Sequence, residues 1–419
     1  MNYPDSVHFL YALGNEIKTA KFGLERIRTL LDALGRPQDR LHFVHVAGTN
    51  GKGSVCAMLE SALRAGGRRT GLFTSPHLTE PTERIRIDGV PISAERFADA
   101  FNRIHAVVEQ LLSDGAVDMH TTYFETVTAM ALLVFEEEHA DMVVLEVGLG
   151  GRLDATNVVL PDLAVITQID FDHEAYLGKS IEAIAGEKAG ILKPGVPAVF
   201  SRQRPEAAKV LAARAVDAHW TCEVPIYDLE LDARGSSFVT DDLYIHCPLA
   251  GEHQVENALT AALALSLLGL TTQAIEAGIA IARWPGRLEH VSGSPEVILD
   301  GAHNPAGARA LAAYIRRFYS GRPVRLIYGA MRDKAIEEIS AILFPLAQQV
   351  IVTAPRQARA LAPETMLQIS DHPNLTTAPG IEEALASAHA LAGPTDVIFV
   401  TGSLFLVAEA RAVIIGSRQ

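Results

Sequence analysis

The sequence has few cysteines, no excess of basic residues and no long apolar run. The three cysteines, Cys56, Cys222 and Cys247, form no CxxC pair, which excludes a disulfide framework and a cysteine-based zinc site. A formal net charge of -14, without a Lys/Arg cluster to override it, argues against nucleic acids and anionic membranes as partners. The longest apolar candidate, residues 258–270, is too short to span a bilayer and predicts a buried helix.

Small molecules are therefore the expected partners. Residues 1–5 lack the basic and then apolar pattern of a signal peptide, and the scarcity of cysteine suits a reducing compartment. We expect a cytoplasmic monomer. An anionic nucleotide can still bind an acidic protein, because local backbone amides, lysines and Mg²⁺ outweigh the distant negative field.

The length of 419 residues exceeds the usual limit of a single core and favours two domains. In the first part of the chain strands alternate with helices, which predicts a mostly parallel α/β sheet covered on both faces. The expected strands are 41–47, 70–73, 142–147, 163–169 and 198–200, and the expected helices are 54–65 and 124–137.

The alternating pattern starts again after residue 287. The expected strands are 297–299, 324–328, 349–352 and 396–401, and the expected helices are 306–318, 336–346 and 404–414. They predict a smaller, Rossmann-like α/β domain, with the boundary at residue 288. Residues 221–248 alternate like antiparallel hairpins and are expected to extend the edge of the first domain.

Residues 48–54, Gly-Thr-Asn-Gly-Lys-Gly-Ser, lie between a predicted strand and a predicted helix. Such a turn points backbone N–H groups and the positive end of the helix dipole at one spot, where phosphates bind. Lys52 would reach the β/γ-phosphates. The alternative is a glycine-rich turn with an incidental lysine. An ordinary P-loop has glycine where this chain has Val46 and a hydroxyl where it has Gly53, so the shortened loop points away from common GTPases and kinases.

Further polar residues follow apolar strands. Glu146 ends one strand, and because ligands collect at the carboxyl ends of parallel strands, it is placed to hold the Mg²⁺ of a nucleotide. Alone, Glu146 would be a solvated carboxylate; its pairing with the phosphate loop reverses that interpretation. His173 ends another apolar run, although a lone histidine is usually structural. In the second domain, residues 300–305 and 401–403 are also loops at the carboxyl ends of strands.

Seven segments occur together in the order of one known family. They are residues 48–54, 74–78, 123–125, 146–157, 172–173, 186–190 and 300–305. They resemble the folylpolyglutamate synthase/dihydrofolate synthase family of the Mur ligase superfamily. The resemblance runs from about residue 18 to residue 407. It implies a P-loop, Mur-ligase-like ATP-binding domain in residues 1–288 and a C-terminal glutamate-ligase domain in residues 289–419.

The resemblance implies an ATP-dependent ligase. A substrate carboxylate attacks the γ-phosphate to form an acyl phosphate, and the amine of L-glutamate then displaces phosphate to leave an amide. Such chemistry needs positioning and charge neutralisation more than covalent help. Residues 151–157 resemble the version found in bifunctional bacterial enzymes, so the expected acceptors are dihydropteroate and tetrahydrofolate polyglutamates.

The resemblance also implies five groups of site residues. The catalytic residues are Lys52, Lys188 and His173. The ATP contacts are Gly48, Thr49, Asn50, Gly51, Lys52, Gly53, Ser54, Asn257, Arg287 and Asp300. Two magnesium ions are expected, on Ser75, Glu146 and His173. The pterin or folate contacts are Thr19, Ala20, Lys21, Phe22, Thr122, Tyr123, Phe124, Glu125, Leu153, Asp154 and Ala155. Glutamate is expected at His303 and Ser403.

Two positions have particular implications. Lys188 aligns with a lysine that is carbamylated in the family, a change that turns a cation into an anion able to support Mg²⁺. The chain departs from the family at Ala335, where a second aspartate is usual after Asp333.

Four alternatives remain open at this point. The first is an enzyme restricted to polyglutamylation of folates, and the second is another Mur-type amide ligase, such as a peptidoglycan-precursor enzyme. The latter usually carries an additional N-terminal domain, and 40 residues precede the first expected strand here. A small-molecule P-loop kinase would use ATP without forming an amide. A non-catalytic nucleotide-binding module would bind ATP without turnover.

Overall fold

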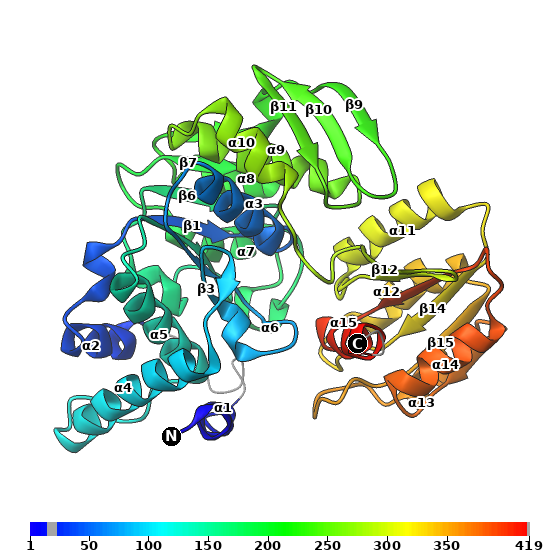
Figure 1. Cartoon of the computed structure of the whole chain (residues 1–419), viewed down its shortest axis with the longest axis horizontal. Helices are drawn as coiled ribbons and strands as arrows, with labels where there is room; N and C mark the ends of the chain where they lie inside the picture. The colour runs from blue at the N-terminus through cyan, green and yellow to red at the C-terminus, as the bar shows by residue number, and fades with distance from the viewer. Residues whose placement is uncertain (15–22, 417–419) are drawn as a thin grey trace. The chain divides into compact units, whose positions relative to one another are not determined.

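The structure, a computed structural model, describes residues 1–14 and 23–416. Its strands form three separate sheets (Figure 1). The largest sheet contains, in spatial order, β4 (Val90–Pro91), β3 (Ile85–Ile87), β2 (Thr70–Phe73), β5 (Met142–Glu146), β1 (Phe43–Ala47), β6 (Leu163–Ile166), β7 (Ala198–Phe200) and β8 (Ala218–Trp220).

This sheet is parallel from β2 to β8, and β3 and β4 add an antiparallel edge. The central strands β1 and β6 are buried along their whole length, as expected for parallel strands covered on both faces. The predicted parallel α/β architecture is confirmed. Strand β6 ends at Ile166, three residues before the expected end, because residues 167–170 bind the phosphate loop.

Helices cover both faces of this sheet (Figure 1). They are α1 (Tyr3–Ala12), α2 (Glu25–Ala33), α3 (Lys52–Ala65), α4 (Ala94–Ser113), α5 (Tyr123–Glu137), α6 (Glu174–Leu177), α7 (Ile181–Lys188), α8 (Pro205–Ala212), α9 (His253–Leu267) and α10 (Thr272–Ala280). Short 3₁₀ turns are η1 (Pro37–Arg40), η2 (Pro81–Arg84), η3 (Ala155–Val158), η4 (Ala189–Ile191) and η5 (Thr221–Glu223). The apolar run predicted as a buried helix lies mostly in α9.

Helices α3 and α10 pack at unusually close range. A Cβ atom built on Gly278 of α10 would stand 2.1 Å from the Cα of Ala62 on α3. Ser61 Oγ donates a hydrogen bond of 2.8 Å to the Gly278 carbonyl. Glycine at position 278 therefore permits a backbone approach that any side chain would prevent. This packing against α10 holds α3, the helix that begins at the phosphate loop, in a fixed position.

The second sheet contains, in spatial order, β12 (Glu289–Gly293), β13 (Glu296–Leu299), β17 (Val397–Thr401), β14 (Val324–Tyr328), β15 (Gln349–Val352) and β16 (Leu375–Thr377). Only β12 is antiparallel to its neighbour. The associated helices are α11 (Pro305–Tyr319), α12 (Ile336–Leu343), α13 (Pro363–Ile369), α14 (Ile381–Leu391) and α15 (Leu404–Gly416). The Rossmann-like prediction is confirmed. The helix expected over 336–346 ends at Leu343 and continues as the 3₁₀ turn η6 (Phe344–Leu346), since Pro345 lacks the N–H that an α-helix needs.

Strands β9 (Tyr227–Leu231), β10 (Ser236–Thr240) and β11 (Leu243–Cys247) form the third sheet. The expected antiparallel edge extension of the first domain is therefore wrong: the edges of the large sheet are β4 and β8. Strand β10 alternates buried and half-buried residues, so this sheet buries one of its own faces instead of lengthening the large sheet.

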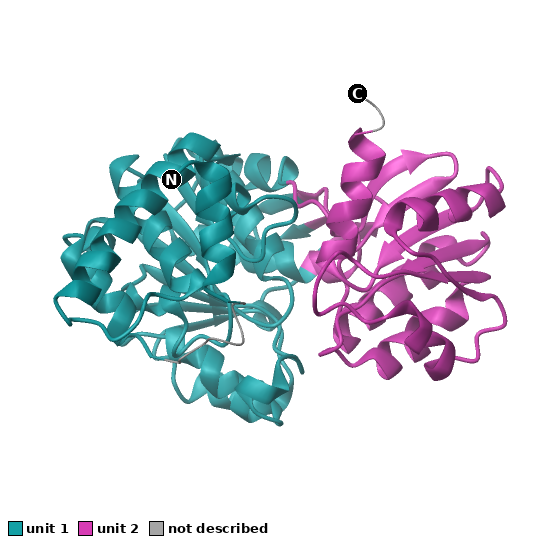
Figure 2. Ribbon diagram, turned by 90° about the horizontal axis from the view of Figure 1, so that it is seen from below, with its two compact units in different colours: residues 1–227, 239–245, 256–282 teal, residues 228–238, 246–255, 283–419 magenta. Residues whose placement is uncertain are grey.

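The chain divides into two compact units (Figure 2). Unit 1 comprises residues 1–227, 239–245 and 256–282, and unit 2 comprises residues 228–238, 246–255 and 283–419. The single boundary placed at residue 288 stays a prediction. In the described part of the chain, no helix combines the length and apolar character needed to cross a membrane.

Candidate nucleotide and ligase site

The phosphate loop joins the end of β1 to the start of α3, as the sequence indicated. Gly48 has φ 149° and Gly51 has φ 89°, in a region that L side chains rarely adopt. A Cβ on Gly48 would stand 1.8 Å from Thr167 Oγ1, and one on Gly51 would stand 2.3 Å from Asn257 Oδ1. Both positions therefore require glycine, and Asn257 of α9 lies against the loop.

The start of the loop is fastened to the residues after β6. The amides of Thr49 and Asn50 both donate to the carbonyl of Gln168, at 2.9 and 3.2 Å. Thr49 Oγ1 donates to the carbonyl of Asp170 at 3.0 Å. These two amides hold the loop in shape, whereas the first-turn amides of a helix have no partner within the helix. The amides of Thr49 and Asn50 thus have partners within the protein, and residues 48–54 stay predicted phosphate contacts.

Two lysines converge on one carbonyl of the loop. Lys52 Nζ donates to the carbonyls of Gly48 and Thr49, each at 3.1 Å, and Lys188 Nζ donates to the Gly48 carbonyl at 2.8 Å. Lys188 is 4% exposed. Burial, reinforced by the positive charge of Lys52, lowers the pKa of Lys188 to about 7. The loop thus brings together two lysine side chains, and the pKa of one of them, Lys188, is lowered.

The expected magnesium residues follow the carboxyl-terminal ends of neighbouring strands in the large sheet. Glu146, buried at the end of β5, accepts a hydrogen bond of 3.0 Å from the backbone N–H of Ser75, which follows β2. His173 precedes α6 in the segment that follows β6. Because β2, β5, β1 and β6 are parallel neighbours in this order, their carboxyl ends lie side by side. Ser75 and Glu146 are in direct contact, and His173 belongs to the same edge.

The segment 151–157 positions Lys188. The side-chain amide of Asn157 donates to the carbonyls of Arg152 and Gly190, at 3.0 and 3.1 Å. The backbone N–H of Arg152 donates to the carbonyl of Glu187 at 2.8 Å. A Cβ on Gly190 would stand 2.4 Å from the Cα of Arg152, so the two segments pack backbone to backbone. The two glycine-containing motifs therefore form one structural unit around the buried lysine.

Asp154 organises its own loop. Its carboxylate is buried and accepts hydrogen bonds from the Leu149 N–H at 2.8 Å, the Thr156 N–H at 3.0 Å and Thr156 Oγ1 at 2.5 Å. Burial raises the pKa of Asp154, and these hydrogen bonds oppose that shift. The visible role of Asp154 is structural. A pterin contact from Asp154, Leu153 or Ala155 stays a prediction.

Two residues expected at the pterin site stabilise the start of α5. Thr122 and Glu125 form a capping box, in which each side chain accepts a hydrogen bond from the backbone N–H of the other. Glu125 also accepts two hydrogen bonds from the guanidinium of Arg26, at 2.8 and 3.0 Å. This buried bidentate pair joins α2 to α5, and sequence reasoning had not identified Arg26.

The other two residues of this segment lie among aromatic and basic neighbours. The Tyr123 ring stacks on Tyr11 of α1 with centroids 5.7 Å apart, and the Arg84 guanidinium lies 5.1 Å from the Tyr123 centroid. A Cβ on Gly148 would stand 2.4 Å from the ring of Phe124. This segment therefore packs against the turn that follows Glu146. The remaining predicted pterin residues, Thr19, Ala20, Lys21 and Phe22, lie outside the described residues.

In unit 2, the predicted residues gather around the ends of β13 and β17. Asp300 accepts hydrogen bonds of 3.0 Å from the backbone N–H groups of Leu288 and Ala302. A Cβ on Gly301 would stand 2.5 Å from Arg287 Nη1, so Arg287 and Asp300 occupy the same corner. Their proximity supports the prediction that both residues contact ATP.

The two expected glutamate loops are neighbours within unit 2. The Gly402 N–H donates to the Ala302 carbonyl at 3.1 Å, which joins the loop of Ser403 to the loop of His303. His303 Nδ1 lies 2.8 Å from the Gly301 carbonyl. Ser403 Oγ accepts a hydrogen bond of 3.1 Å from the Phe405 N–H at the start of α15. The parallel pairing of β13 and β17 accounts for this adjacency.

The fold and these contacts define an α/β protein with a nucleotide-phosphate loop, bordered by a buried lysine and a buried carboxylate. Residues 46–265 match the Mur ligase middle domain, and residues 286–404 match the Mur ligase glutamate ligase domain.

Similar proteins cover nearly the whole chain. Dihydrofolate synthase/folylpolyglutamate synthase from Bacillus subtilis is 36% identical over 93% of this chain and 94% of its own length. The structure of Mycobacterium tuberculosis folylpolyglutamate synthase complexed with ADP has a TM-score of 0.91 at 35% identity and covers 98% of both chains. E. coli FolC in complex with DHPP and ADP has a TM-score of 0.89 at 33% identity, covering 100% of this chain and 99% of FolC. The chain belongs to the dihydrofolate synthase/folylpolyglutamate synthase family of Mur ligases.

Proposed function

We propose that the chain is an ATP-dependent ligase that adds L-glutamate to dihydropteroate and to tetrahydrofolate polyglutamates. The observation that carries this proposal is the meeting of Lys52 and Lys188 at the Gly48 carbonyl, at the edge of the sheet that also holds Glu146. Family membership supports the same reaction.

Lys52 and the first-turn amides of α3 bind the phosphates of ATP. Their positive potential favours the charge that develops as the substrate carboxylate attacks the γ-phosphorus and the bond to ADP breaks. The amine of glutamate then attacks the acyl carbon, inorganic phosphate leaves with the bonding electrons, and the nitrogen loses one proton to give the amide.

Ser75, Glu146 and His173 would hold the two magnesium ions. The buried Glu146 carboxylate supplies hard oxygen ligands and stands beside Ser75, a donor set that fits Mg²⁺. When bound, Mg²⁺ neutralises phosphate charge. Asn257 lies against the loop, and Arg287 and Asp300 are also proposed to contact ATP.

Lys188 is proposed to carry a carbamate. Its pKa of about 7 leaves much of the amine neutral at physiological pH, and a neutral amine is the form that adds to CO₂. The nitrogen forms a bond to carbon, and one proton is released. The product is an anion in place of a second cation near Lys52, which removes their repulsion and provides an oxygen ligand or base.

Residues 1–288 are assigned to the ATP, magnesium and pterin sites, and residues 289–419 to the glutamate site at His303 and Ser403. A pterin would lie along residues 19–22, 122–125 and 153–155. We further propose a cytoplasmic monomer.

The test is ADP release by the purified protein with Mg²⁺ and L-glutamate, comparing dihydropteroate with tetrahydrofolate. Stimulation by both is expected. Stimulation by tetrahydrofolate alone would limit the enzyme to polyglutamylation, and stimulation by neither would overturn the proposal. A phosphorylated product without glutamate would favour a kinase, UDP-linked acceptors would favour another Mur ligase, and ATP binding without turnover would favour a binding module.

A further inference from the structure

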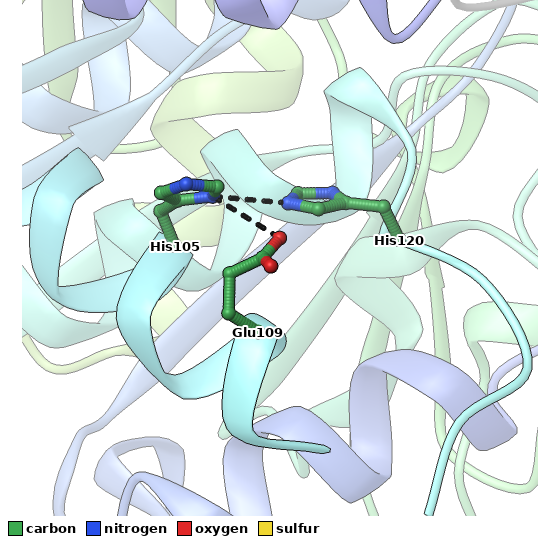
Figure 3. Close-up of side chains that lie close together, drawn as sticks. All are labelled: His105, Glu109 and His120. Atoms are coloured by element: carbon green, nitrogen blue, oxygen red, sulfur yellow. Dashed lines mark hydrogen bonds and ion pairs between the residues drawn. The ribbon is translucent and has the colours of Figure 1, made fainter. Parts of the chain in front are cut away.

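Two histidines and a glutamate come together at helix α4 and the segment that follows it (Figure 3). His105 and Glu109 occupy neighbouring turns of α4, and His120 lies on the segment that leads into α5. His105 Nδ1 is 3.3 Å from His120 Nε2 and 3.9 Å from Glu109 Oε1. One ligand atom from each residue lies within 4.8 Å of the other two.

The hydrogen bonding of His120 determines which nitrogen offers a lone pair. Its Nδ1 lies 2.9 Å from the Thr121 carbonyl. Because a carbonyl only accepts, Nδ1 carries the proton, and the lone pair of the neutral ring is on Nε2, the atom that faces His105. Metal-binding histidines have this arrangement, in which one nitrogen donates to a backbone carbonyl and the other binds the ion.

Packing against aromatic rings holds both imidazoles in place. The Phe9 ring of α1 lies 4.7 Å from the His105 ring and 5.4 Å from the His120 ring, measured between centroids. The Phe101 ring stacks on His105 with 9° between their planes. Two ring nitrogens are therefore preorganised at the surface, which lowers the entropic cost of binding an ion.

The spacing agrees with tetrahedral coordination. Metal–ligand bonds of about 2.1 Å place the ligand atoms of a tetrahedral zinc ion about 3.4 Å apart. The two nitrogens already stand at 3.3 Å, in a hydrogen bond from His105 Nδ1 to His120 Nε2 whose proton a binding ion displaces. The Glu109 side chain is 57% exposed, so small rotamer changes can bring its carboxylate closer. Its exposure also leaves the fourth position accessible to water or an external ligand.

We propose that His105, Glu109 and His120 form a binding site for a divalent transition metal, with Zn²⁺ as the best-fitting ion. Two imidazoles and one carboxylate suit Zn²⁺, whereas Mg²⁺ prefers oxygen ligands. The site shares no residue with the proposed magnesium site. It also needs no cysteine, so the scarcity of cysteine does not bear on it.

A bound ion would tie α4 to the segment before α5. His120 is followed by Thr121, whose Oγ1 lies 2.8 Å from Thr126 Oγ1 in the first turn of α5. The same helix start carries the predicted pterin residues 122–125. An ion at this site would therefore restrict the motion of one side of the proposed pterin site. This consequence rests on the proposed function, whereas metal binding itself does not.

Calorimetric titration of the metal-stripped full chain with Zn²⁺ tests the proposal. Excess Mg²⁺ is present to occupy oxygen-rich sites. One saturable site is expected, and His105→Ala or His120→Ala should weaken it by about tenfold or more. The control is His42→Ala, since His42 is an exposed imidazole 3.0 Å from a single carboxylate, Asp162. It should leave binding unchanged.

Two further measurements separate a lost site from a misfolded variant. Glu109→Gln changes an exposed side chain and should reduce Zn²⁺ affinity without altering the metal-free melting curve. Replacement of Zn²⁺ by Co²⁺ should give the visible absorption of tetrahedral coordination. Absence of saturable binding, or equal binding by wild type and all three cluster variants, would overturn the proposal whatever the ligase assay reports. Metal binding with no ligase activity would sustain the site and reject the proposed function.

Discussion

At the scale of single residues, the two lysines at the Gly48 carbonyl differ in their burial and in their proposed roles. Lys52 is the first residue of α3 and is half-buried, whereas Lys188 is buried and its pKa is lowered to about 7. The same carbonyl therefore contacts one lysine that is proposed to bind phosphate and one that is proposed to be carbamylated.

Replacement of Lys52 should remove turnover. Lys52→Ala deprives the transition state of a cation, and the loss of kcat is expected to be about a hundredfold or more. Lys52→Arg should not restore the rate, because the planar guanidinium cannot occupy the position of a compact ammonium. Steady-state ADP release measures both variants, and Lys209→Ala, on the exposed surface of α8, is the control. Near-normal ADP release by Lys52→Ala would exclude the assigned role.

Lys188 should make stability depend on pH. Its pKa is about 7 in the folded state against 10.5 for the free side chain, so the unfolded chain binds more protons between these values and stability rises with pH. The slope is at most about 1.4 kcal/mol per pH unit. Urea unfolding in CO₂-free buffer, compared with Lys188→Met, should show this slope between about pH 7 and 9. Parallel curves for the two proteins would contradict it.

At the scale of secondary-structure elements, helix termini and close helix contacts determine how firmly the loops are held. Helix α3 begins at the loop that is proposed to bind phosphate, and it contacts α10 through Gly278. Helix α12, in unit 2, begins after Ala335 without a side-chain cap.

Gly278→Ala should destabilise unit 1. The added Cβ would stand 2.1 Å from Ala62 Cα, a backbone atom that cannot rotate away, so the cost is expected to be about 2 kcal/mol or more. Thermal unfolding measures the loss. Gly321→Ala is the matched control, because a Cβ there would have no neighbour within 4 Å, and its melting temperature should stay close to wild type. Equal melting temperatures for the two variants would refute the close-packing argument.

Ala335→Asp should stabilise unit 2. Ala335 occupies the N-cap of α12 and supplies no side-chain hydrogen bond, so an aspartate can accept one from a first-turn amide. The expected gain is about 1 kcal/mol. Ala335→Asn provides a similar cap without the charge and separates the hydrogen bond from repulsion by Glu337 and Glu338. Denaturant unfolding of both variants measures the free energy of unfolding. If neither variant is more stable than the wild type, the alanine at position 335 does not weaken the start of α12.

At the scale of the whole molecule, the prediction of two α/β regions was confirmed because hydrophobic runs and glycine-rich turns are local patterns. The phosphate loop, for example, lies between β1 and α3 as expected. The early end of β6 was not visible in its apolar sequence, since it depends on the Gln168 carbonyl accepting amides from a loop far away in the chain. The structural roles of Glu125 and Asp154 were missed for the same reason.

In the candidate metal cluster, too, the sequence pattern indicated one part and only the folded chain revealed the other. The spacing of His105 and Glu109 by four residues was a readable signal on a helix. The third ligand, His120, has no periodic relation to them and reaches the cluster only because the chain turns back between α4 and α5. Sequence reasoning accordingly had no basis for grouping the three.

The sequence by itself determined the family, the alternating α/β architecture and the phosphate loop, because these depend on residue order over short stretches. The tertiary structure alone decided that Lys188 meets Lys52 at Gly48, that Glu146 lies beside Ser75, and that Asp154 bonds within its own loop. These contacts join segments brought together by the packing of parallel strands, so their distances, burial and pKa shifts exist only in the folded chain.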